Sequence, residues 1–246
     1  MKTSIASHRG GALLWAENSP LAFENTAKLP VEQVEFDVHP TRDGRLVVIH
    51  DETLDRTTDG KGPVAAQDWA DLSKLILKGS GGQRMLLLEE VMDIFRPTKI
   101  VLRLEIKTGP NRVPYPDPHV ANVMKAVTAG GMLDRTVITS FQLGTVVEAL
   151  RHGTPQHSVW LVAPMTQVDI GLAAVVHAAK TNGVPMLGLH GPLLDAPTVA
   201  AVRKAGLGIG GWACNTPALI SKMFETGVDV FTTDRPDLAL AERDKK

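Results

Sequence analysis

The chain has 246 residues, of which 43% are hydrophobic, enough for a sizeable core in one large domain or two small ones. Its formal net charge is −1 with no basic block, which gives no indication of a nucleic-acid partner or of binding to an anionic membrane surface. The single cysteine, Cys214, excludes an internal disulfide framework.

The first part of the chain is predicted to form a strand, a loop, a helix and a β-hairpin. Ser19-Pro20 has the pattern of an N-cap followed by a first-turn proline, which begins a helix that runs to about Leu29. Asp43-Gly44 marks a turn, and we expect the segment after it to extend the preceding strand as a short hairpin outside any barrel. The strands predicted here cover residues 3–7, 33–38 and 46–49.

The middle of the chain is less regular. Residues 52–84 are rich in turn-forming glycine, and only 67–77 is predicted to be helical. A helix over 88–95 and a strand over 100–106 follow, and a proline-rich loop then leads into a helix over 119–129.

The rest of the chain alternates strand and helix at short spacing. The predicted strands cover 136–140, 158–162, 185–189, 207–213 and 228–232, and the predicted helices 142–152, 168–180, 194–204, 216–225 and 236–243. Eight strands that alternate with eight helices favour parallel pairing with right-handed crossovers.

We therefore predict an α/β protein with one domain over residues 1–246. Its fold is a (β/α)₈ (TIM) barrel with a short β-hairpin extension and an irregular insertion after the second strand, since such barrels typically have ~250 residues. A doubly wound open sheet is the alternative. It is disfavoured because polar candidate residues end many different strands rather than two neighbouring ones.

Two acidic residues share one face of the second predicted strand. Side chains alternate between the faces of a strand, so Glu35 and Asp37 point the same way from an otherwise apolar segment. Two carboxylates side by side there are costly unless a positive group lies between them. The plainer alternative is one acid in a salt bridge and the other at an exposed strand end.

Further ionisable residues lie at the ends of other strands. His8 and Arg9 follow the first strand, His50 follows the hairpin, and Glu105 and Lys107 end the strand over 100–106. The C-terminal ends of barrel strands share one rim, where the active sites of such barrels lie. This rim would bring together three acids for a metal ion, two histidines for proton transfer and two cations for an anion. Other polar or aromatic residues at strand ends are Ser140, His190, Trp212 and Asp234.

Several short motifs together resemble the glycerophosphodiester phosphodiesterase family. They are His8-Arg9-Gly10, Glu17-Asn18-Ser19, Glu35-Phe36-Asp37-Val38, His50-Asp51 with Thr53-Leu54-Asp55-Arg56-Thr57-Thr58, Leu104-Glu105-Ile106-Lys107, Ser140-Phe141, Trp212 with Asn215, and Gly227-Val228-Asp229 through Thr233-Asp234-Arg235-Pro236. The matches run in order from residue 5 to about residue 240. The resemblance implies a (β/α)₈ barrel, a divalent metal ion, and hydrolysis of a phosphodiester between glycerol 3-phosphate and an alcohol.

Carried over residue by residue, the resemblance implies that His8 and His50 are catalytic and that Glu35, Asp37 and Glu105 are metal ligands. Three carboxylates without a cysteine suit one hard divalent cation, Mg²⁺ or Ca²⁺. One neutral histidine would take a proton from the nucleophile, and the other, protonated, would give one to the leaving alcohol. In the family the nucleophile is water or the substrate's own glycerol hydroxyl, and the sequence leaves both open.

Other residues are predicted to bind the phosphate or the rest of the substrate. The resemblance implies that Arg9 and Lys107 contact the phosphate. Trp212 and, more weakly, Phe141 are expected to wall the pocket, while Glu17 has the alternative role of bracing the first loop and orienting Arg9. The full set is Arg9, Lys107, Glu17, Asn18, Phe141, His190 and Trp212.

Two residues raise separate questions. Arg103 shares a strand face with Glu105 and Lys107 and should point into the barrel, where a buried arginine needs an anionic partner. We expect a purely structural ion pair; the alternative is a pair with a metal-ligating acid, which would weaken metal binding. Pro40 indicates that the second strand stops before it, which would leave His39 as a solvent-exposed rim residue.

The predicted function is metal-dependent hydrolysis of small, soluble glycerophosphodiesters by His/His acid–base catalysis. A lysophospholipase D-type activity on lysophospholipids is one alternative; it would favour an exposed apolar collar at the rim, but the loops 52–84 and 108–118 are mostly polar. A non-catalytic barrel that binds a phosphate ligand is the other, and it would not need two histidines. No long apolar run marks a signal peptide or a membrane span, so we expect a cytoplasmic protein without integral membrane association.

Overall fold

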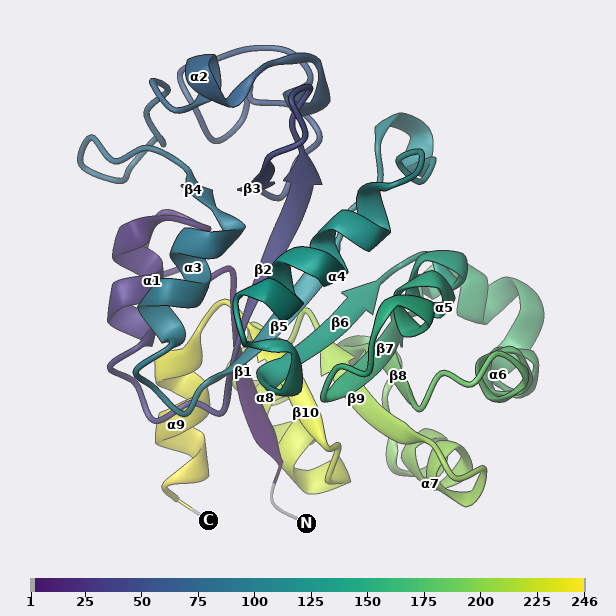
Figure 1. Cartoon of the computed structure of the whole chain (residues 1–246). Helices are drawn as coiled ribbons and strands as arrows, with labels where there is room; N and C mark the ends of the chain where they lie inside the picture. The colour runs from purple at the N-terminus through teal and green to yellow at the C-terminus, as the bar shows by residue number, and fades with distance from the viewer. Residues whose placement is uncertain (1–2, 246) are drawn as a thin grey trace.

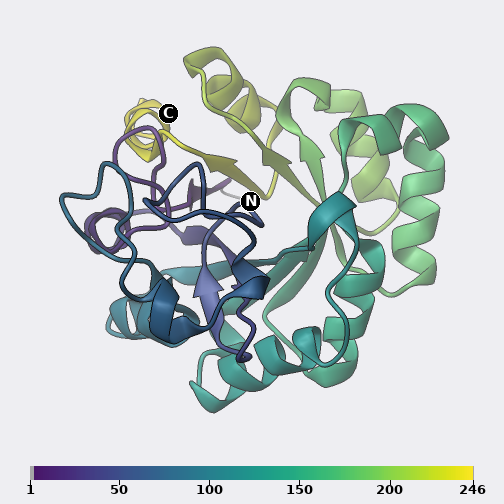
Figure 2. The same cartoon turned by 90° about the horizontal axis from the view of Figure 1, so that it is seen from above.

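The first and last strands of the predicted barrel pair with each other, and this closes the sheet. In the computed structural model, which describes residues 3–245, β1 pairs in parallel with both β2 and β10. The eight parallel barrel strands are β1 (Ser4–His8), β2 (Gln33–Pro40), β5 (Val101–Ile106), β6 (Thr136–Ser140), β7 (His157–Leu161), β8 (Met186–His190), β9 (Gly208–Trp212) and β10 (Val230–Thr233). Figure 2 looks along the barrel. Residues 1, 2 and 246 of the predicted domain lie outside the described residues.

Helices between the strands cover the outside of the barrel (Figure 1). They are α1 (Pro20–Thr26), α3 (Leu88–Phe95), α4 (His119–Ala129), α5 (Leu143–His152), α6 (Pro164–Thr181), α7 (Ala196–Lys204), α8 (Pro217–Thr226) and α9 (Pro236–Arg243). Short 3₁₀ turns at Val64–Ala66, Pro110–Arg112, Leu133–Arg135 and Gly191–Leu193 lie in the connections. The predicted single-domain (β/α)₈ barrel is confirmed. No helix among the described residues is both long enough and apolar enough to cross a membrane.

The predicted hairpin extension is confirmed and is longer than expected. Strand β3 (Leu46–Val48) pairs antiparallel with the end of β2, and β4 (Leu86–Leu87), which the sequence did not predict, pairs antiparallel with β3. Both strands belong to an insertion that stands above the barrel in Figure 1. The insertion has a small apolar core of its own, made of Val47, Ile49, Leu54, Val64, Leu72, Leu77, Met85 and Leu87.

Two predicted helices have different bounds in the structure. The helix predicted over 67–77 is wrong in length: α2 covers only Trp69–Leu72, because Ile76 and Leu77 form isolated β-bridges with other parts of the insertion. The helix predicted over 168–180 begins earlier, at Pro164. It is interrupted at Gly171, whose φ of 77° and ψ of 157° are not helical.

Alternation along the strands divides the apolar core from the site. Outward side chains such as Phe36 pack beneath the helices, where Phe23 contacts Phe36 and Phe95 edge-to-face at centroid distances of 5.9 Å. Inside the barrel, one cluster contains Ala6, Val137, Val159, Leu161, Met186 and Val230. Ionisable side chains from β1, β2 and β5 occupy the interior nearer the C-terminal ends of the strands. Inside the barrel, apolar side chains therefore lie beneath the polar groups of the rim.

One buried histidine should make folding sensitive to mild acid. His119, the first residue of α4, is 5% exposed, and burial lowers its pKa to about 4. The unfolded chain, with an ordinary histidine pKa near ~6.5, binds a proton that the folded chain does not bind as the pH falls from 6.5 to 4. We expect His119 to cost about 2 kcal/mol of unfolding free energy between pH 7 and pH 5. Urea unfolding at both pH values should show a smaller loss for His119→Phe; an equal loss would contradict the expectation.

Candidate active site

The register of neighbouring strands brings the three predicted metal ligands together. Asp37 lies opposite Glu105 in the pairing of β2 with β5, and Glu35 lies opposite His8 in the pairing of β1 with β2. Glu35, Asp37 and Glu105 are buried, and one carboxylate oxygen from each lies within 4.8 Å of the others. Three buried carboxylates thus meet at the rim.

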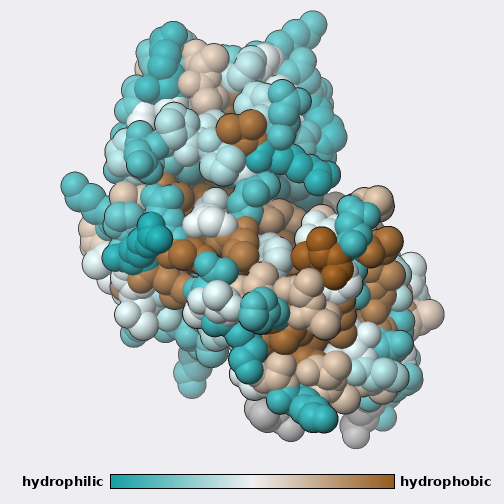
Figure 3. Space-filling model, turned by 90° about the vertical axis from the view of Figure 1, so that its right-hand side faces the viewer, coloured by the Kyte–Doolittle hydropathy of each residue, from teal (hydrophilic) through white to brown (hydrophobic). Residues whose placement is uncertain are grey.

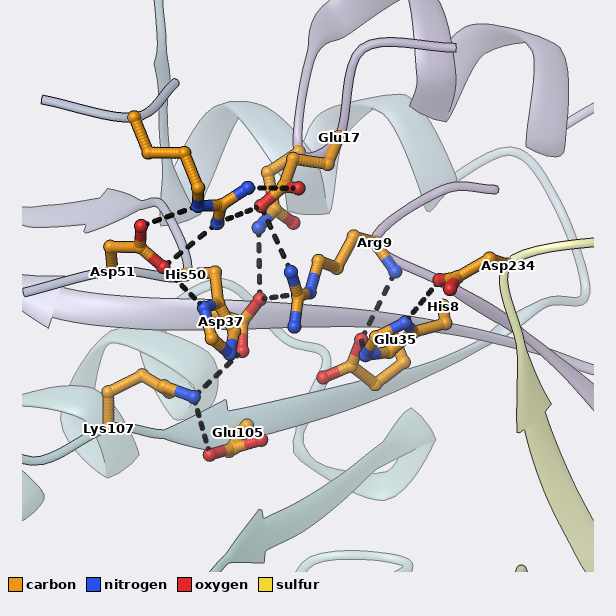
Figure 4. Close-up of polar contacts among 12 residues, drawn as sticks. His8, Arg9, Glu17, Glu35, Asp37, His50, Asp51, Glu105, Lys107 and Asp234 are labelled. Carbon is orange, nitrogen blue, oxygen red and sulfur yellow. Dashed lines mark hydrogen bonds and ion pairs between the residues drawn. The ribbon is translucent and has the colours of Figure 1, made fainter. Parts of the chain in front are cut away.

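The carboxyl groups of this cluster differ in pKa because their charged neighbours differ. Burial and the charge of Asp37 raise the pKa of Glu35 to about 7. Burial also acts to raise the pKa of Asp37, but Lys107, His50 and Arg9 outweigh it and hold that pKa below its ordinary value. The Nζ of Lys107 lies 2.9 Å from Glu105 Oε1 and 3.4 Å from Asp37 Oδ1 (Figure 4). One acid of the group is therefore poorly compensated by the protein alone.

Each of the two predicted catalytic histidines donates from Nδ1 to an aspartate. His8 Nδ1 lies 2.5 Å from Asp234 Oδ1, and Asn215 orients Asp234 by donating to its Oδ2 and accepting from its backbone N–H. Burial acts to lower the pKa of His8, but Glu35 and the hydrogen bond to Asp234 outweigh it, so this pKa is raised. The other ring nitrogen, Nε2, lies 3.6 Å from Glu35 Oε2.

His50 is held by a chain of ion pairs that also reaches Arg9. Its Nδ1 donates to Asp51 Oδ1 at 2.7 Å. Arg56 donates to both oxygens of Asp51 and to both oxygens of Glu17, at 2.6 to 2.8 Å, and Glu17 Oε1 accepts from Arg9 Nη1 at 3.1 Å. Arg56 comes from the insertion, so this chain of ion pairs ties the insertion to the first βα loop (Figure 4).

His39 corrects a prediction, since it is 1% exposed and is not a solvent-exposed rim residue. Strand β2 continues to Pro40 because β3 pairs with its end, and this covers His39. Its Nε2 donates to the backbone oxygen of His50 at 3.1 Å, while its Nδ1 accepts from Tyr115 Oη at 2.8 Å. An imidazole that donates from one ring nitrogen and accepts at the other is neutral. This agrees with the pKa of His39, which burial lowers to about 4. His39 therefore supports the backbone beside the second catalytic candidate.

The first loop adds further contacts to Asp37. Asn18 Nδ2 donates to Asp37 Oδ2 at 2.9 Å, and Arg9 Nε lies 3.5 Å from the same oxygen. Both residues have positive φ, 54° for Asn18 and 49° for Arg9, which turns the loop back over the carboxylates. Asn18 is 2% exposed, so its observed role is to hold a metal-ligand candidate.

The expected structural ion pair of Arg103 is not formed with any carboxylate in the described chain. Arg103 is 3% exposed, and its one hydrogen bond is a long one, 3.5 Å, from Nη1 to Gln33 Oε1. Burial lowers its pKa to about 10, although Glu35 and Glu105 act to raise it. Its guanidinium thus acts on the acidic cluster at a distance, without a direct contact.

Two adjoining cavities open among these groups. The smaller, about 210 Å³, is lined by His8, Arg9, Glu35 and Arg103; the larger is about 550 Å³ and has Lys107 in its wall. The residues common to both are His50, Glu105, Phe141 and Trp212. Phe141 and Trp212 contact each other edge-to-face at 5.3 Å, so both lie where the sequence predicted a pocket wall. Glu17, Asn18 and His190 line neither cavity; the ring of His190 lies against that of Trp212, with centroids 4.5 Å apart and the planes tilted by 42°. Their contact with substrate stays a prediction.

The carboxylate cluster fits the divalent cation that the sequence implied. Asp37 Oδ1 is buried and has no hydrogen-bond partner among the described residues, although Lys107 Nζ lies nearby. Three buried carboxylates with no sulfur or imidazole among them form a donor set that suits a hard cation. A cation there would also compensate the charge that keeps the pKa of Glu35 near 7.

Sequence reasoning did not assign roles to two residues that complete the site. Asp234 was noted as a polar residue at the end of the last strand and as part of a family motif, without a role, and its pairing with His8 spans 226 positions. Arg56 lay in a segment with no recognisable periodicity, and only the folded insertion brings it to Glu17 and Asp51. A strand-end position and a motif of the family resemblance marked Asp234, whereas Arg56 was marked only by its place in the motif over residues 53–58.

Comparison with known proteins identifies the class of enzyme that this barrel represents, a phosphoric diester hydrolase. The model of the glycerophosphoryl diester phosphodiesterase family matches residues 8–238, and the chain belongs to that family.

Individual relatives are similar in sequence over nearly the whole chain. A protein of Caldanaerobacter subterraneus subsp. tengcongensis named glycerophosphodiester phosphodiesterase is 30% identical over 96% of both chains. One of the same name from Bacillus altitudinis is 29% identical over 99% of both. The crystal structure of a protein described as a glycerophosphoryl diester phosphodiesterase from Agrobacterium tumefaciens str. C58 has a TM-score of 0.97 and 39% identity, and the match covers 100% of this chain and 98% of that one.

Proposed function

We propose that this protein hydrolyses glycerophosphodiesters to glycerol 3-phosphate and an alcohol, with one bound divalent cation, Mg²⁺ or Ca²⁺. The observation that carries the proposal is the meeting of three buried carboxylates with two His–Asp pairs around one small cavity. A binding protein would not need two imidazoles held in fixed tautomers. A carboxylate at Nδ1 leaves Nε2 as the nitrogen that faces a reactant.

The substrate's phosphate would lie between the cations of the rim. Arg9 and Lys107 are the proposed phosphate contacts, with Arg103 as a third positive charge in the wall of the smaller cavity. Glu17 fixes Arg9, and Glu105 and Asp37 fix Lys107, so these cations are positioned before the substrate arrives. Charge that is positioned in advance costs little reorganisation when negative charge grows on the phosphoryl oxygens.

Proton transfer is assigned to the two histidines. One takes a proton at Nε2 from the attacking hydroxyl or water, and the other gives a proton to the oxygen of the leaving alcohol. Asp234 and Asp51 hold the two rings and stabilise whichever imidazolium is present. Phe141 and Trp212 would wall the substrate and exclude water from it.

Glu35, Asp37 and Glu105 are the proposed ligands of the divalent cation. When bound, such an ion polarises a phosphoryl oxygen and helps to stabilise the charge that develops during displacement.

The activity is tested by release of glycerol 3-phosphate from glycerophosphocholine, glycerophosphoethanolamine and glycerophosphoinositol, each with and without chelator. We expect release from at least one diester and its loss in chelator. No release from any of them, with Mg²⁺ or Ca²⁺ supplied, would overturn the proposal.

Glu105→Gln tests the metal ligands, because it keeps the side-chain shape and removes one of the three charges. We expect the metal concentration for half-maximal activity to rise by about tenfold to a hundredfold, with the fold intact. Asp37→Asn should behave alike. Glu89→Gln, an exposed glutamate on α3, is the matched control and should leave the metal requirement unchanged. An unaltered metal titration for Glu105→Gln would remove that residue from the ligand set.

A further inference from the structure

One buried arginine in the wall of the smaller cavity has no anionic partner among residues 3–245. Arg103 is 3% exposed, forms no ion pair with a carboxylate of the described chain, and makes one long hydrogen bond, 3.5 Å, to Gln33. Burial lowers its pKa to about 10, a value that still keeps the guanidinium protonated at neutral pH. A buried cation without a partner is costly, so its presence in the cavity wall calls for an anion from outside the chain.

Strand register places Arg103 inside the barrel, deeper than the proposed metal ligand of the same strand. It lies two residues before Glu105 on the same face of β5, which is about 7 Å along the strand. Its neighbours in the register are Glu35 on β2 and Val137 on β6, and Val137 belongs to the apolar cluster inside the barrel. The smaller cavity, which both Glu105 and Arg103 line, thus extends past that carboxylate to a positive charge in its inner wall.

The acidic cluster does not account for this charge. Lys107 Nζ lies 2.9 Å from Glu105 and 3.4 Å from Asp37, and Arg9 Nε lies 3.5 Å from Asp37. The proposed divalent cation would compensate the charge that remains on the three carboxylates. Arg103 contacts none of them, so its guanidinium is free to bind a ligand when the metal site is filled.

The reacting phosphate does not account for it either. Of the two proposed phosphate contacts, Arg9 lines the smaller cavity and Lys107 lines the larger one, so the phosphate would lie where the cavities adjoin. Arg103 lines only the smaller cavity. Another part of the substrate would therefore lie between the phosphate and Arg103. The volume of this cavity, about 210 Å³, limits that part to a small group.

We propose that Arg103 binds a carboxylate on the substrate, which is then a glycerophosphodiester of a small hydroxy acid. A guanidinium pairs with a carboxylate through two parallel hydrogen bonds, and such a pair is at its strongest where water is excluded. Thr139 and Thr232 line the same cavity and bring hydroxyl groups to its wall. The insertion beside this rim is mostly hydrophilic in Figure 3, which agrees with a substrate that carries two negative charges.

This inference rests on the proposed function and names its substrate class. The reaction is unchanged: phosphorus gains the oxygen of water, its bond to the oxygen of the hydroxy acid breaks, and that oxygen takes a proton. The products are glycerol 3-phosphate and the free hydroxy acid.

The test compares glycerophosphoglycerol with glycerophosphoglycerate, in which a carboxylate replaces one terminal CH₂OH group. In the wild type we expect kcat/KM to be at least about thirtyfold higher for glycerophosphoglycerate, because a buried charge pair that loses one partner typically loses that much or more. Arg103→Met keeps the length of the side chain and removes its charge. In this variant the two kcat/KM values should lie within about threefold of each other.

Two further variants separate the guanidinium from charge in general. Arg103→Lys should keep only part of the preference, because an ammonium retains the charge without the two parallel donors. Arg151→Met is the matched control, since Arg151 is an exposed arginine of α5 that lines neither cavity. Its preference should equal that of the wild type. The wild-type comparison needs no variant, so it tests the inference even where a substitution impairs folding.

The outcomes separate this inference from the function on which it rests. Hydrolysis of both diesters without a preference in the wild type would overturn the inference and leave the proposed function standing. A preference that survives Arg103→Met would do the same. An equal loss on both diesters in that variant would assign Arg103 to the reacting phosphate and also overturn the inference. Hydrolysis of neither diester, with Mg²⁺ or Ca²⁺ supplied, would overturn both.

Discussion

His8→Ala and His50→Ala are each expected to lower kcat by about two to four orders of magnitude, the usual contribution of a positioned acid or base. Their side chains are 24% and 32% exposed and line the cavity, so thermal stability should fall little. Steady-state kinetics and thermal unfolding check both points. His152→Ala, at an exposed histidine of α5, is the matched control and should have wild-type activity.

A substrate with an activated leaving group divides the two roles. A p-nitrophenol leaving group needs little protonation, so the variant that lacks the general acid should recover strongly while the variant that lacks the base stays slow. We expect recovery in one of the two variants. Equal recovery in both, or in neither, would mean that these histidines do not divide the two proton transfers, and unfolding of either would assign it to the core.

Asp234→Asn is expected to lower kcat by about two orders of magnitude or more, because an amide cannot stabilise the His8 imidazolium and can favour the wrong tautomer. Asn215 donates to Asp234 Oδ2 and accepts from the Asp234 backbone N–H. The variant's amide oxygen can accept the first bond and its backbone keeps the second, so the fold should survive. The measurement is kcat for the single variants and for His8→Ala/Asp234→Asn.

The double variant distinguishes a catalytic pair from two separate effects. Residues that act as a unit lose activity non-additively, so the double variant should be no slower than His8→Ala alone. Losses that multiply would contradict the assignment of Asp234 to His8. Asp195→Asn is the matched control: Asp195 caps α7 and lines neither cavity, so its replacement should cost no catalysis.

The fold could be predicted because local signals agreed with the global pattern. Ser19 accepts from Ala22 N–H and Pro20 begins α1, as the cap motif indicated, and the alternation on β2 places Glu35 and Asp37 on one face. The insertion could be predicted less well. Its extended segments at Ile76 and Leu77 depend on partners distant in sequence, which no local periodicity reveals.

The candidate site residues could be predicted from their positions at strand ends. The contacts that support them could not. Strand register makes Asp37 and Glu105 neighbours, so the acidic cluster is a consequence of the barrel itself. The burial of His39 depends on β3 and on Tyr115, which is 76 positions away. Likewise, the missing partner of Arg103 could be recognised only from the packed interior, since a strand pattern gives the direction of a side chain and not what it meets.

The proposed dependence of the activity on a metal ion is tested most directly at the three buried carboxylates, because the protein alone compensates their charge poorly. The protein is stripped with chelator, dialysed, and assayed for glycerol 3-phosphate release as Mg²⁺ or Ca²⁺ is added back, while binding of the same ion is followed by calorimetry. We expect one binding site per chain, no activity before addition, and recovery that follows occupancy. Full activity in the stripped protein, or binding that persists in Glu35→Gln/Asp37→Asn/Glu105→Gln, would contradict the account.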